Sequence, residues 1–192
     1  MDVQTRLGMP MDEFIRLYEA APFELIDGER IPLVPPVAIH VYIVNRLLTY
    51  LIVYLQSNPV GEAFAESTFV LTEGSDWVKG SRVPDIAFFQ IERWQGYITQ
   101  TPDWGDKPFV LVPDLCVEVV SKNDMYADVS KKVTGYLEDG VRLVWVIDPR
   151  GKAIHIYTAG SNQITLLTAD DTLTGGDVLP DFAVAVKDIF PE

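Results

Sequence analysis

Apolar residues along the chain gather into short runs of strand length and a few longer runs of helix length. Residues 115–120 and 141–148 are nearly continuous apolar runs, a pattern typical of strands that are covered on both faces. Between them, residues 124–139 carry apolar side chains at helical spacings, and Gly140 ends that pattern. A strand, a helix and a second strand in this order predict a crossover with parallel pairing.

The first 60 residues predict two helices and a hairpin. Residues 10–20 form the first helical pattern, with acidic residues in its first turn. Asp27-Gly28 lies between two alternating runs and predicts a tight hairpin, because that turn requires positive φ. Residues 37–57 give the longest predicted helix, which is almost apolar enough for a membrane span. Polar residues such as His40 interrupt it, so we expect a core helix that lies partly in a subunit interface.

The remaining expected elements are a strand pair or one bent strand over 63–72, turns at 73–76 and 79–81, a strand over 83–89, an irregular aromatic-rich insertion over 92–108, a hairpin over 153–168 and a short turn-rich tail from residue 173. With 192 residues and no internal repeat or linker, the chain is expected to form a single domain over residues 1–192. The predicted class is α+β, with a central mixed β-sheet flanked by helices.

Composition limits the partners of the chain. The net charge of −13 argues against a broad basic surface for nucleic acid, because such surfaces hold phosphates with Lys and Arg. It does not argue against a nuclease, since acids that bind divalent cations add negative charge. Cys116 is the single cysteine, so no disulfide forms within the chain. Together with an amino terminus unlike a signal peptide, this favours a cytoplasmic protein with no membrane partner.

Two acidic residues stand inside apolar strands, where a carboxylate has no packing role. Asp85 lies near the start of the 83–89 run and Glu118 in the middle of the 115–120 run. A buried charge is costly, so each acid must be paired, protonated or bound to a metal. Hard oxygen ligands suit Mg²⁺ or Mn²⁺, and Lys131 or Lys132 on the following helix would supply a cation. This order fits metal-dependent hydrolysis of a phosphodiester.

Several short motifs in a fixed order resemble those of a known family. Arg82-Val83-Pro84-Asp85 followed by Val117-Glu118-Val119 resembles the PD-(D/E)XK nuclease signature, and the whole ordered set resembles the Uma-type "putative restriction endonuclease" family. The further matching segments are Glu24 to Glu29, His40, Pro113 to Ser121, Asp128 to Lys132 with Tyr136, Gly140-Val141 and Trp145 to Pro149.

The resemblance implies a restriction-endonuclease-like α/β/α core and a Mg²⁺- or Mn²⁺-dependent endonuclease that cuts DNA. Asp85 and Glu118 would hold the metal, Lys132 would position the attacking water, and Glu24 would be an accessory acid. By analogy with other nucleases of this fold, the chain is expected to act as a homodimer.

The lysine departs from the general signature. That signature places it two residues after the second acid, where this chain has Val120. The family resembled has its lysine on the next helix, four residues before a tyrosine, and the matching residues here are Lys132 and Tyr136. Lys131 points about 100° away from Lys132 on a helix, so only one of the two can face the site.

Each candidate residue also has a structural explanation. Asp85 could cap its own turn, Glu118 could pair with Arg82, Glu24 could pair across the hairpin, Lys132 could lie on a solvated helix face, and His40 could be a hydrogen-bonded core histidine. Two other functions fit the same residues. One is a nuclease-like binding or assembly module with little catalysis, and the other is a metal-dependent hydrolase of RNA or of another phosphoester.

Overall fold

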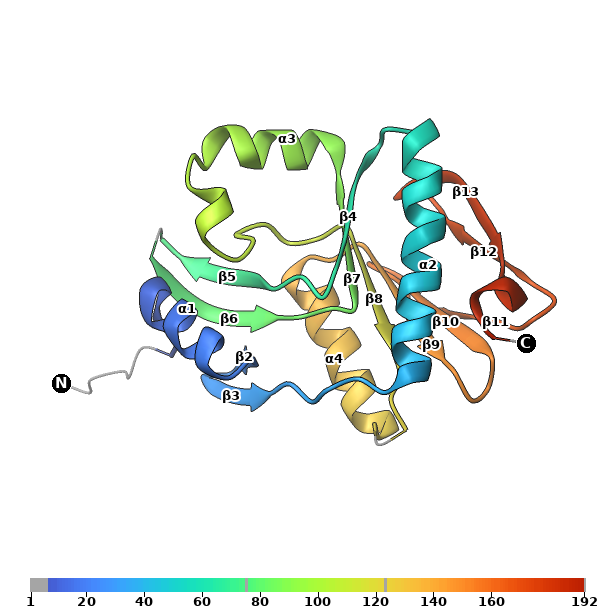
Figure 1. Ribbon diagram of the computed structural model, residues 1–192, viewed down its shortest axis with the longest axis horizontal. Coiled ribbons are helices and arrows are strands. Elements are labelled where there is room, and N and C mark those ends of the chain that lie inside the picture. The colour runs from blue at the N-terminus through green and yellow to red at the C-terminus, as the bar shows by residue number, and fades with distance from the viewer. Residues whose placement is uncertain (1–6, 75, 123, 192) are drawn as a thin grey trace.

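The computed structural model describes residues 7–74, 76–122 and 124–191. In chain order the elements are β1 (Met9–Pro10), α1 (Met11–Ala20), β2 (Phe23–Ile26), β3 (Glu29–Pro32), α2 (Ala38–Ser57), β4 (Gly61–Ala65), β5 (Phe69–Glu73), β6 (Trp77–Arg82), β7 (Ile86–Gln90), α3 (Ile91–Gln100), the short helix η1 (Trp104–Asp106), β8 (Leu115–Val119), α4 (Tyr126–Asp139), β9 (Leu143–Asp148), β10 (Ala153–Thr158), β11 (Ile164–Leu167), β12 (Thr172–Gly175), β13 (Leu179–Ala185) and η2 (Val186–Ile189). Figure 1 shows their arrangement.

A six-stranded mixed sheet forms the centre of the molecule, with the strand order β11-β10-β9-β8-β7-β4. β8 and β9 pair in parallel, with α4 as the crossover between them. The other neighbouring strands of this sheet pair antiparallel. The predicted crossover and the predicted α+β class with a central mixed sheet are therefore confirmed.

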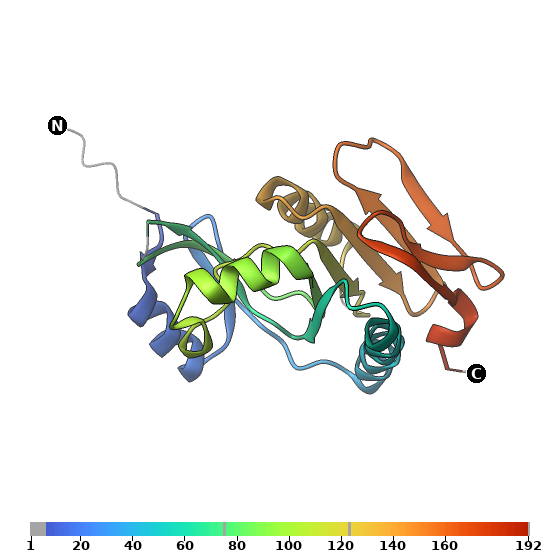
Figure 2. The ribbon, with the colours of Figure 1, turned by 90° about the horizontal axis from the view of Figure 1, so that it is seen from above.

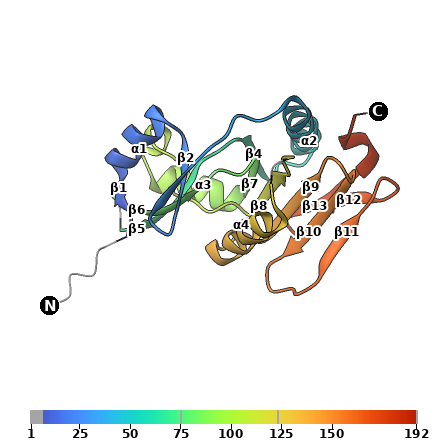
Figure 3. The same ribbon diagram turned by 90° about the horizontal axis from the view of Figure 1, so that it is seen from below.

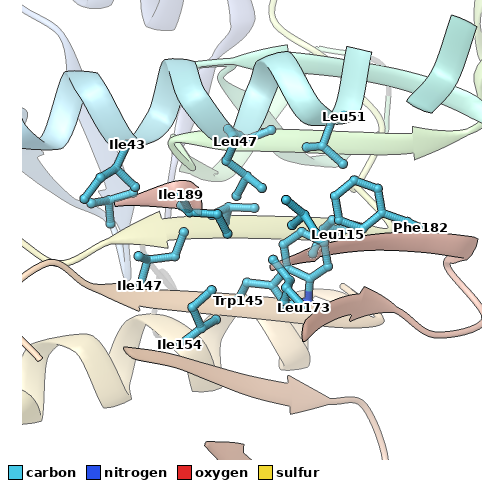
Figure 4. Packing of buried hydrophobic residues seen from close by; sticks show 14 of the residues in the cluster. Ile43, Leu47, Leu51, Leu115, Trp145, Ile147, Ile154, Leu173, Phe182 and Ile189 are labelled. Atoms are coloured by element: carbon cyan, nitrogen blue, oxygen red, sulfur yellow. The ribbon is translucent and has the colours of Figure 1, made fainter. Parts of the chain in front are cut away.

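The two faces of β8 pack against different helices, because successive side chains of a strand point to opposite faces of the sheet. On one face Leu115 and Val117 join the largest apolar cluster, together with Ile43, Leu47 and Leu51 of α2. Figure 4 shows these α2 side chains pointing at the sheet. On the other face Cys116 packs with Val133 and Tyr136 of α4. Glu118 follows the same alternation as Cys116, so its side chain lies on the α4 face of the sheet.

A second group of elements lies beside this sheet, as Figure 2 shows from above. β1, β6 and β5 form a three-stranded sheet, and β2 and β3 form a separate hairpin. Asp27 and Gly28, with φ of 51° and 82°, make the predicted turn of that hairpin. α1 packs over this part through Met11 and Phe14, which join one apolar cluster with Phe23 and Leu25 of β2.

Three local predictions were wrong. Residues 79–81 lie inside β6 rather than in a turn: Gly80 and Ser81 pair with Leu71 and Val70 of β5, and the register shift between Leu71 and Thr72 leaves Lys79 as the extra residue of a bulge. The 92–108 insertion begins with helix α3, whose Trp94 and Tyr97 pack with Phe89 and Ala87 of β7. The tail contains the hairpin β12–β13, which places Leu173 and Phe182 against the α2 face of the sheet. In each case contacts with distant residues outweigh the local turn signal.

Helix α2 presents one face to the core and another to the surface. By length and composition it could cross a membrane, since its apolar window has a mean hydropathy of 1.5 and is 22% buried. Ile43, Leu47 and Leu51 are fully buried in the core, whereas Ile52 and Val53 are 44% and 58% exposed. The expected core helix is therefore present, with an apolar strip left on its outer side.

Candidate active site

A groove of about 1540 Å³ contains all the residues predicted for catalysis. Its walls come from the β2–β3 hairpin, the segment of residues 31–37 that leads into α2, and one side of α4 along its length. Figure 3 shows the chain passing from the β2–β3 hairpin to α2. Glu24, His40, Asp85, Glu118 and Lys132 all line the groove. Residues far apart in the sequence thus meet at one end of the central sheet.

Asp85 and Glu118 are brought together by strand pairing. β7 and β8 run antiparallel with Ile86 opposite Val117, so the next position along sets Asp85 opposite Glu118. The Asp85 backbone amide donates to the Val117 carbonyl at 3.0 Å, which extends the pairing beyond β7. The Asp85 carboxylate accepts a hydrogen bond from the Val119 amide at 2.6 Å. Asp85 therefore belongs to the site rather than to its own turn.

Glu118 is held at both carboxylate oxygens by residues of α4. The Lys132 ammonium lies 2.9 Å from Oε2, and the Tyr136 hydroxyl donates a short hydrogen bond to Oε1. Lys132 and Tyr136 are one helical turn apart, which puts both on the face that covers the sheet. Burial raises the pKa of Glu118 to about 7, with the nearby Asp85 adding to the effect and Lys132 opposing it. The structure thus directs Lys132 inward and leaves Lys131 exposed.

Lys132 is also close to a second acid. Its ammonium lies 3.7 Å from Oε1 of Glu24, and the same oxygen accepts a hydrogen bond from the Val83 amide at 2.8 Å. Burial disfavours the charged ammonium, but the carboxylates of Glu118 and Glu24 outweigh it and raise the pKa of Lys132. Lys132 is therefore a cation at neutral pH. Glu24 is buried beside it rather than exposed on its strand.

His40 contacts the first acid of the pair. Its Nε2 lies 2.9 Å from Oδ1 of Asp85, and both side chains are mostly buried. The hydrogen bond to Asp85 raises the pKa of His40, and burial opposes that shift. Sequence analysis named His40 as a matching position of the family and as a candidate hydrogen-bonded core histidine, and its partner is Asp85. Its place in the first turn of α2 puts it within hydrogen-bond distance of Asp85, the residue before β7.

Arg82 does not pair with Glu118, which was the structural explanation considered for that acid. Its Nε lies 2.9 Å from Oδ2 of Asp139, and the two side chains are 13% and 11% exposed. Gly135 makes this path possible, since a Cβ there would lie 3.0 Å from an Arg82 nitrogen. Arg82 therefore links the end of β6 to the end of α4. Glu118 contacts Lys132 and Tyr136 instead.

The donor chemistry of the groove suits a hard divalent cation. Asp85 and Glu118 offer carboxylate oxygens, and Mg²⁺ is commonly held by one or two carboxylates together with waters and substrate phosphates. Burial raises the pKa of Glu118 although Lys132 lies beside it, and a cation bound to the carboxylate would favour its charged form. Within the described ranges, however, no three His, Cys, Asp or Glu side chains gather closely enough to hold a metal by themselves. A cation here would need ligands from water or substrate.

Comparison with known proteins agrees with this geometry. The family model Uma2, described as "Putative restriction endonuclease", matches residues 11–187. The chain belongs to the Uma2 family. The match covers both acids, Lys132 and Tyr136, and it supports a nuclease-like function. A search of the curated proteins finds no match.

A solved structure shares the fold of this Uma2-family chain. It is the crystal structure of a putative nuclease belonging to DUF820 from Anabaena variabilis ATCC 29413. The two chains are 22% identical, with a TM-score of 0.76 over 95% of this chain and 97% of that chain. At this identity the similarity establishes the fold, and the predicted nuclease-like core is confirmed.

Proposed function

We propose that the chain is a Mg²⁺- or Mn²⁺-dependent endonuclease that hydrolyses the phosphodiester bonds of DNA. The observation that carries this proposal is the meeting of Asp85, Glu118 and Lys132 in one groove, with Lys132 2.9 Å from Glu118. Two carboxylates at the end of a mixed sheet can hold the divalent cation of a metal-dependent phosphodiester hydrolysis, and a lysine beside them can stabilise the charge that develops on the phosphate. Membership of the Uma2 family supports the same assignment.

Asp85 and Glu118 would hold the cation, which when bound would lower the pKa of a water and neutralise charge on the phosphate. The Lys132 ammonium has three N–H groups, and one of them is directed at Glu118. The others are available to orient the attacking water and to donate to a phosphate oxygen as its negative charge grows. Glu24 and Tyr136 position Lys132 and Glu118 for these roles.

The test is a cleavage screen with Mg²⁺ and with Mn²⁺ over DNA, with RNA strands in parallel. Glu118→Gln should abolish cleavage and Lys132→Ala should slow it by about 10²- to 10³-fold, while the far-UV circular dichroism stays that of the wild type. Glu138→Gln is the matched control, because Glu138 is an exposed acid that lines the same groove. Full activity in folded Glu118→Gln, or cleavage of RNA alone, would contradict the proposal.

A second candidate is a binding or assembly module that keeps the nuclease fold with little catalysis. It is favoured by the existing pairing of both acids, since Glu118 is bound to Lys132 and Asp85 to His40. In that case the ion pairs would serve stability alone. Retained folding without metal affinity in the wild type would distinguish this candidate from the nuclease.

The proposal includes a homodimer and a cytoplasmic location. The apolar strip on the outer side of α2, which includes Ile52 and Val53, supports a contact between two copies. Sedimentation of the wild type beside Val53→Asp tests the dimer, since a charge in the strip should leave only monomer. The location rests on composition, and fractionation of cells that express the tagged chain would test it.

A further inference from the structure

The outer face of α2 is exposed, largely apolar and almost free of charge. Among residues 38–57, Arg46 is the single Asp, Glu, Lys or Arg. Its guanidinium is engaged inside the chain, since Nε donates to the Asp188 carbonyl at 3.0 Å and Cζ lies 5.2 Å from the centre of the Tyr50 ring. The whole chain carries a net charge of −13, so two copies repel one another over most of their surface. On the outer face of α2 they can meet without that repulsion.

The exposed apolar residues of this face form a pattern that is symmetric about the middle of the helix. Val41 and Tyr42 are 40% and 44% exposed, and Ile52 and Val53 are 44% and 58% exposed. The first pair lies six and five residues before Leu47, and the second pair five and six residues after it. Leu47 itself points into the core, and at 100° per residue the four side chains lie within about 60° of the opposite direction. Such a face matches itself when a second copy is turned end for end.

The two polar residues at the centre of the face are compatible with such a contact. Thr49 Oγ1 donates to the Asn45 carbonyl at 2.8 Å, and Asn45 Nδ2 donates to the Val41 carbonyl at 2.9 Å. Each side chain thus uses a donor within its own helix. An asparagine has a further N–H and a side-chain oxygen, which can pair with Asn45 of a second copy. A buried asparagine of this kind fixes the register of paired helices.

We propose that two copies of the chain pack their α2 helices antiparallel, with the two-fold axis at the level of Leu47. Val41 of each copy then faces Ile52 of the other, and Tyr42 faces Val53. Because the same residues are used on both sides, the contact closes as a dimer and does not propagate. This inference rests on the proposed function, because it gives the geometry of the homodimer included there.

The arrangement has a consequence for the two active-site grooves. His40, which contacts Asp85, lies seven residues before Leu47 on α2. At 1.5 Å per residue the two copies of His40 would lie about 21 Å apart along the helix pair. The dimer therefore carries its two grooves at opposite ends of the helix pair, each with its own Asp85 and Glu118.

Disulfide cross-linking in the full chain tests this register. Cys116 is buried, so introduced thiols at the surface report on the contact. Tyr42→Cys and a tagged Val53→Cys, mixed and mildly oxidised, should form a covalent dimer of mixed composition, because facing positions of paired helices come within the roughly 7 Å that a disulfide allows between Cα atoms. Tyr42→Cys alone should stay unlinked, since the antiparallel arrangement holds its two copies about 15 Å apart along the helix pair. Leu166→Cys is the matched control, because Leu166 is 55% exposed on β11, and it should not link to Val53→Cys.

Sedimentation measures the strength of the same contact. Val53→Asp should raise the dissociation constant of the dimer at least about 100-fold, because each dimer would bury two aspartates against apolar side chains. Leu166→Asp introduces the same charge at a similarly exposed position and should leave the dissociation constant unchanged. Both positions are exposed, so far-UV circular dichroism should be that of the wild type in each variant.

Three results would overturn the inference. Tyr42→Cys that links to itself would show a parallel arrangement, and a dimer in which Tyr42→Cys does not link to Val53→Cys would place the contact elsewhere. A wild type that sediments as a monomer would leave the face to another occupant, and binding of that monomer to phosphatidylcholine vesicles would identify a lipid surface.

These outcomes are distinct from the outcome for catalysis. A monomer that cleaves DNA would overturn the inference and leave the endonuclease in place. A dimer that links through positions 42 and 53, without cleavage in Mg²⁺ or Mn²⁺, would support the inference and contradict the endonuclease instead.

Discussion

Lys132 and Glu118 form an ion pair at the innermost part of the groove, with the ammonium 2.9 Å from the carboxylate. The pair is mostly buried, at 28% and 13% side-chain exposure. Such a pair is not needed for stability, because well-packed apolar residues often serve as well. Its place beside Asp85, in a groove open to solvent, fits a role in chemistry.

Lys132→Ala should lower the rate of DNA cleavage by about 10²- to 10³-fold, the usual cost of losing a group that stabilises developing charge. Lys131→Ala should leave the rate within about twofold, because Lys131 is exposed on the adjacent helix face. The measurement is single-turnover cleavage with equal metal concentrations. Equal losses in both variants would assign the effect to the net charge of α4 rather than to Lys132.

Glu118 should make the metal-free protein less stable as the pH rises. Its pKa is raised from 4.5 to about 7 in the folded protein, so between these values the folded state binds more protons than the unfolded state. Stability is therefore lost as the pH rises through this window. Glu118→Gln removes this titration, so its free energy of unfolding should change less between about pH 5 and pH 8 than that of the wild type.

Urea unfolding of both proteins in chelator, at the two pH values, measures this difference. The same comparison for Glu138→Gln provides the control, since its exposed carboxylate lies outside the Lys132 contact. If the difference in free energy of unfolding between Glu118→Gln and the wild type does not change with pH, the raised pKa of Glu118 does not cause the pH dependence.

Tyr136→Phe should shift the acid limb of the pH–rate profile upward. The Tyr136 hydroxyl donates to Glu118, and this hydrogen bond favours the charged carboxylate. Without it the pKa of Glu118 rises further, so a higher pH is needed to deprotonate the metal ligand. Cleavage rates between about pH 5 and pH 9 check the shift. If the cleavage rate falls by the same factor at every pH, without a shift of the acid limb, Tyr136 acts through packing and not through the pKa of Glu118.

Asp139→Asn should destabilise the protein by about 3 kcal/mol, because it leaves the buried Arg82 guanidinium without a countercharge. Burial raises the pKa of Asp139 despite Arg82, which shows that desolvation is felt at this pair. Urea unfolding at neutral pH gives the loss, and Glu138→Gln, one residue earlier on α4, serves as the exposed control. Equal stability of the two variants would show that Arg82 needs no partner.

The sequence predicted the central part of the fold because there the local pattern and the tertiary contacts agree. The apolar runs of β8 and β9, the helical spacing of α4 and the Asp27-Gly28 turn each carry their own signal. Helix α3 was missed because Trp94 and Tyr97 gain their burial from Phe89, a residue on another element. β6 was missed because its pairing with β5 overrides the turn preference of Gly80.

The sequence named candidate residues that lie together in the groove, but it could not predict their contacts. Glu118 stood out as an acid in an apolar strand, and helix geometry left Lys131 and Lys132 as alternatives. The contact of His40 with Asp85 joins positions 45 residues apart, so no local pattern could indicate it. The pairing of Arg82 with Asp139 likewise depends on the close approach that Gly135 permits.

Metal binding should depend on both acids and on pH. Calorimetric titration of Mn²⁺ into the wild type should give a binding isotherm, and Asp85→Asn and Glu118→Gln should each weaken it by more than about tenfold. Affinity should rise as the pH passes through about 7, because Glu118 must lose its proton before it can bind a cation. Glu138→Gln should bind as the wild type does.

The titration also decides between the two candidate functions. Mg²⁺ sites often need substrate phosphates to complete them, so the experiment is repeated with a DNA strand present. Binding that appears with the strand and disappears in Glu118→Gln would make Asp85 and Glu118 a site shared between protein and substrate. If no cation binds with or without the strand, the pairs Lys132–Glu118 and His40–Asp85 are structural. The binding-module candidate then replaces the endonuclease.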